Sequence, residues 1–136
     1  MSDQLLMDTH VLYWYMEADR ALGERARKRL DRALADGALH ASAISVFEFG
    51  ELIRIRRFKP FNTEGWVDRA AAGGLAWLPL DVDGAIETGR LPGTPPRDPF
   101  DRMLIATSRV RGLTLATRDG GILDYGAAGH LRTLEV

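Results

Sequence analysis

The chain contains no cysteine among its 136 residues. This absence excludes a disulfide framework and a zinc site built from thiolates. Its three histidines, His10, His40 and His130, lack the spacing of a histidine metal motif such as HExxH. Any bound metal ion must therefore be held by oxygen atoms.

The sequence also lacks an excess of charge of either sign, since 18 Lys and Arg residues face 19 Asp and Glu residues. Without an overall positive field, any binding of nucleic acid must use a local patch. No apolar run approaches the roughly 20 residues that span a bilayer, and the first residues do not resemble a signal peptide. We therefore expect a cytoplasmic protein that does not enter a membrane.

Short apolar runs alternate with amphipathic segments, at a length and hydrophobic content that suit one domain over residues 1–136. This alternation predicts an α/β fold with a parallel sheet, right-handed crossovers and helices on both faces. Strands are expected at residues 5–7, 39–44, 75–80, 113–117 and 131–136. Helices are expected at residues 11–16, 22–36, 45–57, 63–72, 82–90 and 99–111.

Carboxylates stand close to the ends of several expected strands. Asp8 follows the first strand, and Glu48 lies one turn into the helix after the second. Asp98 and Asp101 open the helix before the fourth strand, and Asp119 follows that strand. Because the carboxyl ends of parallel strands meet at one edge, all five side chains should converge. Crowded carboxylates resist joint ionisation unless a cation such as Mg²⁺ or Mn²⁺ joins them. The pattern predicts metal-assisted phosphodiester hydrolysis.

Each of these acids also has a purely structural interpretation. Asp8 and Asp98 are each placed to cap the start of a helix. Ser45 and Glu48 have the spacing of a capping box. Asp119, which precedes two glycines, suits an ordinary turn. Only their joint placement after successive strands favours a shared site.

Four segments in a fixed order carry these acids and span almost the whole chain. They are LLMDTH at residues 5–10, SAISVFE at 42–48, DPFDRMLIA at 98–106 and LATRD at 115–119. These segments resemble the motifs of the PIN-domain family, and within it those of the VapC-like toxins of bacterial toxin-antitoxin pairs.

The resemblance implies a PIN-like three-layer α/β/α sandwich with a central parallel sheet. It further implies Mg²⁺- or Mn²⁺-dependent endoribonuclease activity, a homodimer and inhibition by a small VapB-like antitoxin. By motif, the core acidic and metal-binding set is Asp8, Glu48, Asp101 and Asp119. Asp98 is a further catalytic candidate, because its segment offers two aspartates and either one could be the core ligand.

Other polar residues near the acids have two interpretations each. Thr9 and Thr117 would either hold ligands and substrate or merely cap backbone groups. Arg54 would contact phosphate or complement the end of its helix. Arg102 would contact phosphate or form an ion pair. His10, beside Asp8, is equally open to a structural or a catalytic role.

Five aromatic residues extend these expectations. Tyr13, Trp14 and Tyr15 are consecutive on a helix, so all three cannot be core and at least one should be exposed. Dimer or antitoxin docking, base stacking and peripheral packing would each suit an exposed aromatic. Trp66 and Trp77 should pack internally.

Three other functions fit parts of the pattern. A phospho-signalling receiver domain also gathers aspartates at the end of a parallel sheet, but it needs a lysine after its fifth strand, and the only lysines are Lys28 and Lys59. A catalytically silent PIN-like module would bind RNA or protein without cutting. A structure-specific DNA nuclease would use similar acids on a different substrate.

Overall fold

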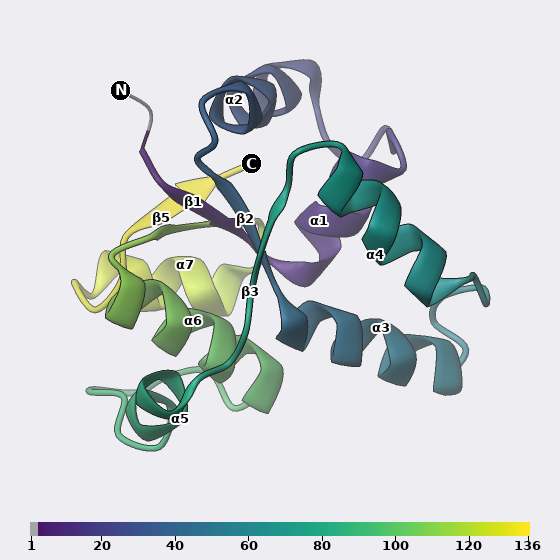
Figure 1. The fold of residues 1–136 in the computed structure, drawn as a ribbon. Helices are drawn as coiled ribbons and strands as arrows, with labels where there is room; N and C mark the ends of the chain where they lie inside the picture. Colours follow the sequence, from purple (N-terminus) through teal and green to yellow (C-terminus); the bar gives the residue numbers. More distant parts are fainter. Residues whose placement is uncertain (1–2) are drawn as a thin grey trace.

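The computed structural model describes residues 3–136 and contains a sheet of five parallel strands (Figure 1). The strand order is β3-β2-β1-β4-β5, so β1 is central and the chain order reverses beside it. This arrangement confirms the α/β class predicted from the sequence. The strands are β1 (Leu5–Met7), β2 (Leu39–Ser42), β3 (Ala76–Leu78), β4 (Thr114–Thr117) and β5 (Thr133–Glu135).

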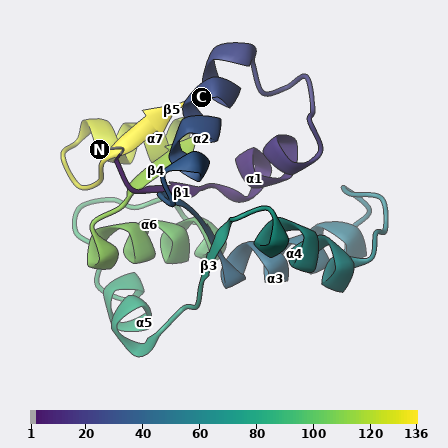
Figure 2. The same cartoon turned by 45° about the horizontal axis from the view of Figure 1, so that its top comes forward.

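Helices cover both faces of this sheet, because alternate residues of a strand point to opposite sides. Leu5 and Met7 of β1 pack into one buried cluster with residues of α1, α2, α3 and α4, whereas Leu6 packs into another with α6 and α7. Figure 2 shows α5 outside α6, away from the sheet. The helices are α1 (Thr9–Met16), α2 (Glu24–Ala35), α3 (Ala43–Arg54), α4 (Thr63–Ala72), α5 (Val82–Thr88), α6 (Pro99–Arg111) and α7 (Gly120–Ala127).

Two local predictions were wrong. Helix α7 was not expected, because Gly120, Gly121 and Gly126 give this segment a low helix propensity. It forms because Ile122 and Tyr125 bury their side chains against the sheet. Helix α3 begins at Ala43, two residues before the expected start, so Ser45 lies inside the helix rather than at its cap.

The aromatic residues largely follow the expected division between core and surface. Trp66 is buried within the cluster that covers one face of the sheet, as predicted. Trp77 is only partly buried, since it belongs to the edge strand β3. Tyr13 and Trp14 are both partly exposed. Among residues 3–136, no helix is long and apolar enough to cross a membrane.

Candidate active site

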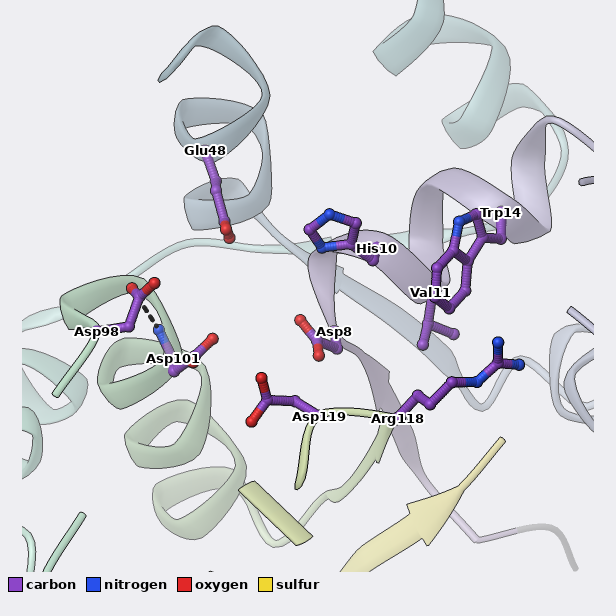
Figure 3. A pocket seen from close by; sticks show the side chains of 9 residues that line it. All are labelled: Asp8, His10, Val11, Trp14, Glu48, Asp98, Asp101, Arg118 and Asp119. Atoms are coloured by element: carbon purple, nitrogen blue, oxygen red, sulfur yellow. Dashed lines mark hydrogen bonds between the residues drawn. The ribbon is translucent and has the colours of Figure 1, made fainter. Parts of the chain in front are cut away.

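The structure brings the five predicted acids together around one cavity of about 320 Å³. This cavity, which we call the acidic pocket, lies at the carboxyl ends of β1 and β4, next to the point where the strand order reverses. Parallel α/β sheets commonly bind ligands at such a position. Figure 3 shows the acids on one side of the pocket and a group of other side chains on the opposite side. The lining residues are Asp8, His10, Val11, Trp14, Glu48, Asp98, Asp101, Arg118 and Asp119.

Asp8 is positioned by the sheet rather than by a helix cap. It stands directly after β1 at the cap position of α1, but its side chain makes no capping hydrogen bond. Instead, Oδ2 accepts a hydrogen bond of 2.7 Å from the Thr117 hydroxyl at the end of β4. Burial raises the pKa of Asp8, and the nearby charge of Asp119 adds to this effect. The capping interpretation of Asp8 is therefore wrong.

Glu48 is held in a similar way, from the second turn of α3. Its Oε1 accepts a hydrogen bond of 2.6 Å from the Thr9 hydroxyl, which also lies 2.8 Å from the hydroxyl of Ser45. Because Ser45 is engaged with Thr9 inside the helix, the capping-box interpretation is wrong, and Ser42 caps α3 instead. Burial raises the pKa of Glu48, followed by the charges of Asp8 and Asp98.

Asp98 and Asp119 both cap helices, as predicted for Asp98, whereas Asp119 was expected to lie in an ordinary turn. Asp98 Oδ1 accepts hydrogen bonds from two backbone amides in the first turn of α6. Asp119 Oδ1 accepts a bond of 3.0 Å from the Ile122 amide at the start of α7. Capping occupies one oxygen of each carboxylate, which leaves Oδ2 available to a ligand in the pocket. For these two residues the structural role and a ligand-binding role are compatible.

Asp101 lies among the other four carboxylates. Burial raises its pKa to about 8, and the negative charges of Asp8, Asp98, Asp119 and Glu48 all contribute. Figure 3 shows its side chain directed toward the space between Asp8 and Asp119. This is the position expected for a group that shares a cation with its neighbours.

The donor set of the pocket fits a hard divalent cation. All five acids are carboxylates, which Mg²⁺ and Mn²⁺ prefer. Within residues 3–136, none of the five forms an ion pair with Lys or Arg. In the same part of the chain, no three acidic or histidine side chains already stand at metal-ligand spacing. A cation would therefore have to draw the carboxylates closer together, against repulsion that its own charge removes.

The other predicted residues divide between the pocket and the surface. Thr9 and Thr117 are buried and hydrogen-bond to carboxylates, and Thr117 Oγ1 also accepts from the Asp119 amide. Neither Arg54 nor Arg102 lines the pocket. Arg54 pairs with Glu51 at the exposed end of α3, and Arg102 donates to a backbone carbonyl. Their role in phosphate binding stays a prediction.

One charged lining residue, Arg118, was missed. Its only signal in the sequence was its place inside the LATRD segment, between Thr117 and Asp119. Neither composition nor helical spacing distinguishes it from the other arginines.

The crowding of charge predicts that Asp101→Asn stabilises the metal-free protein. The pKa of Asp101 is about 8 in the folded chain and near 3.8 when unperturbed. The folded protein thus binds the proton more tightly, and its stability falls as the pH rises through this window. Above pH 8, after allowance for partial exposure of the side chain, Asn should add roughly 1–2 kcal/mol to the free energy of unfolding. Below pH 4 the gain should vanish.

Urea denaturation in EDTA at several pH values would measure this gain. Asp124→Asn, an exposed site on α7, is the matched control and should show no such pH-dependent gain. Equal stability of wild type and Asp101→Asn at pH 8 would show that the carboxylates do not repel one another as the structure indicates.

Comparison with known proteins identifies the family. A model of the PIN domain matches residues 5–128. The chain belongs to the PIN-domain family. The five acids, Thr9 and Thr117 all lie inside the matched region, so the acidic pocket is a feature of the PIN domain itself.

Individual relatives support a VapC-like PIN domain. The chain is 28% identical to Ribonuclease VapC22 of Mycobacterium tuberculosis over 116 residues, 85% of this chain and 86% of that protein. Its fold is similar to DNA-bound VapBC from Salmonella typhimurium, with a TM-score of 0.67, 21% identity and coverage of 99% and 98% of the two chains. It is also similar to VapBC-5, of the VapBC family of toxin-antitoxin systems, from Mycobacterium tuberculosis, with a TM-score of 0.59, 18% identity and coverage of 98% and 99%. The predicted PIN-like fold and the resemblance to VapC proteins are confirmed.

Proposed function

We propose that this PIN domain is a cytoplasmic, Mg²⁺- or Mn²⁺-dependent endoribonuclease. The observation that carries the proposal is the acidic pocket, in which five carboxylates face one cavity and none pairs with a Lys or Arg of residues 3–136. The similarity to a protein named as a ribonuclease supports RNA as the substrate. A pocket of this charge repels RNA unless a cation is present, so binding of metal and of substrate should be coupled.

Each group in the pocket has a distinct part in the proposed reaction. Asp8, Asp101 and Asp119 would hold the metal ion. When bound, the ion activates water and offsets the charge that develops on the phosphoryl oxygens. Glu48 keeps Oε2 free of the bond to Thr9, so this oxygen can accept a hydrogen bond from the attacking water and orient it.

The two threonines prepare this arrangement before substrate arrives. Thr117 fixes Oδ2 of Asp8, and Thr9 fixes Oε1 of Glu48. Both threonines are fully buried, so the carboxylates that they hold have little freedom to reorient. Such preorganisation lowers the cost of assembling the reacting groups.

The function is tested by supplying matched RNA and DNA oligonucleotides to the purified protein. We expect cleavage of RNA with Mg²⁺ or Mn²⁺, no cleavage in EDTA, and recovery when the metal is restored. Equal cleavage of DNA would favour a structure-specific DNA nuclease. Metal-dependent binding of RNA without any cleavage would favour a silent PIN-like module.

We further propose that the protein is the toxin of a toxin-antitoxin pair, with a small VapB-like antitoxin and a homodimeric assembly. The similarity to VapBC complexes supports the antitoxin. We expect a gene for a small DNA-binding protein directly beside the gene for this protein. Mixing its product with this protein should abolish the RNA cleavage. Size-exclusion chromatography with light scattering would measure the assembly.

A further inference from the structure

Arg118 is unusual among the residues of the acidic pocket. It is the one Arg or Lys among the nine lining side chains, and it stands next to Asp119 in the chain. Attraction between opposite charges would favour an ion pair with a carboxylate of the pocket. Within residues 3–136, however, Arg118 forms no such pair. Its contacts explain why.

Three groups outside the acidic set hold the guanidinium of Arg118 away from the acids. Nε donates a hydrogen bond of 2.8 Å to the main-chain oxygen of Val136, and Nη2 donates to the carbonyl of Ala21. The central carbon of the guanidinium lies 4.7 Å from the centre of the Trp14 ring. Figure 3 shows the guanidinium below Trp14, on the far side of the pocket from Asp98 and Asp101.

This arrangement fixes the guanidinium without using all of its hydrogen-bond donors. The two hydrogen bonds use Nε and Nη2, which leaves Nη1 for a ligand. The side chain is exposed, so a ligand has access to it from solvent. Because the side chain is already held in place, binding costs little conformational entropy.

We propose that Arg118 anchors a phosphate of the RNA strand adjacent to the phosphate that is cut. The inference rests on the proposed function and identifies how the same pocket retains its substrate. A cation bound by the carboxylates acts on the phosphate at the cleavage site. Arg118, on the opposite side, binds a neighbouring phosphate and sets the position of the strand across the acids. Guanidinium groups suit this task because they offer directed, charge-assisted hydrogen bonds to phosphate oxygens.

The test measures binding rather than cleavage, so that the two proposals can fail separately. Glu48→Gln protein, which keeps the three residues proposed to hold the metal, is titrated in Mg²⁺ with a labelled single-stranded RNA, with and without Arg118→Gln. We expect Arg118→Gln to weaken binding roughly tenfold. The slope of log K against log salt should fall by about 0.7, the value for one phosphate contact on a single strand.

Arg132→Gln is the matched control. Arg132 is also an exposed arginine that donates to a backbone carbonyl, that of Gly112, and its loss changes the net charge equally. It stands just before β5, at the opposite end of the strands, and does not line the acidic pocket. Binding by Arg132→Gln should match the parent protein. An equal loss in both variants would overturn the proposal.

A second measurement locates the contact along the RNA strand. Single methylphosphonate linkages, which are uncharged, are placed in turn along the RNA and binding to the protein with Arg118 intact is measured. One linkage next to the cleavage site should weaken binding, and Arg118→Gln should add nothing further at that linkage. Additive losses at every linkage would show that Arg118 only ties the chain together through Ala21 and Val136.

Discussion

Asp8→Asn should reduce the rate of RNA cleavage roughly 10²–10³-fold, a loss typical of removing one electrostatic contact from an active site. Asp8 is only 8% exposed and stands at the end of the central strand, so no neighbouring carboxylate can easily replace it. The substitution removes the negative charge that would bind the metal. It retains an oxygen that can accept the hydrogen bond from Thr117. The fold should therefore survive while the activity does not.

Initial rates of cleavage at saturating metal would measure this loss, with thermal melting as a check on folding. Asp68→Asn makes the same chemical change at an exposed position of α4, outside the pocket, and should cleave RNA at the wild-type rate. If Asp8→Asn and Asp68→Asn were equally active, the assignment of the acidic pocket as the nuclease site would be wrong.

The largest loss of stability should come from Phe49→Ala on α3. Phe49 is 0% exposed, and its ring centre lies 5.0 Å from that of Trp66. Rings of Phe58 and Phe61 lie within 6 Å of it as well. Truncating a buried aromatic residue leaves a cavity that rigid neighbours fill poorly, which costs about 3–5 kcal/mol. Chemical denaturation would measure the change in the free energy of unfolding.

Phe47→Ala provides the comparison, because it makes the same change two residues away on the same helix. Phe47 is 58% exposed and contacts only the ring of Phe100 among the aromatic residues of the described chain. Its loss should change the stability by about 0.5 kcal/mol or less. Similar losses for both variants would mean that α3 is not held by the packing of Phe49, and that Glu48 is positioned in some other way.

The fold and the meeting of the acids were predictable from the sequence because both depend on regular patterns. Apolar runs and helical spacing gave the alternation of strands and helices, and the geometry of parallel sheets gave the common edge. Helix α7 was not predictable in this way. Its glycines argue against a helix locally, and only the burial of Ile122 and Tyr125 against distant strands compensates for them.

The individual roles of the acids depend on contacts that sequence spacing does not reveal. Asp8 and Asp98 both precede a helix, and their local sequences suit a cap equally well. Asp98 does cap its helix, whereas Asp8 is bound by Thr117 of another strand. The position of Arg118 also could not be predicted from local sequence, because its hydrogen-bond partners Ala21 and Val136 lie far from it in the chain.

The hydrogen bond between Thr117 and Asp8 joins residues 109 positions apart, and this separation affects when the site can form during synthesis. A growing chain that has not yet produced β4 has neither Thr117 to fix Asp8 nor Asp119 to complete the carboxylate set. Most of the PIN domain must therefore be synthesised before the proposed nuclease site can assemble.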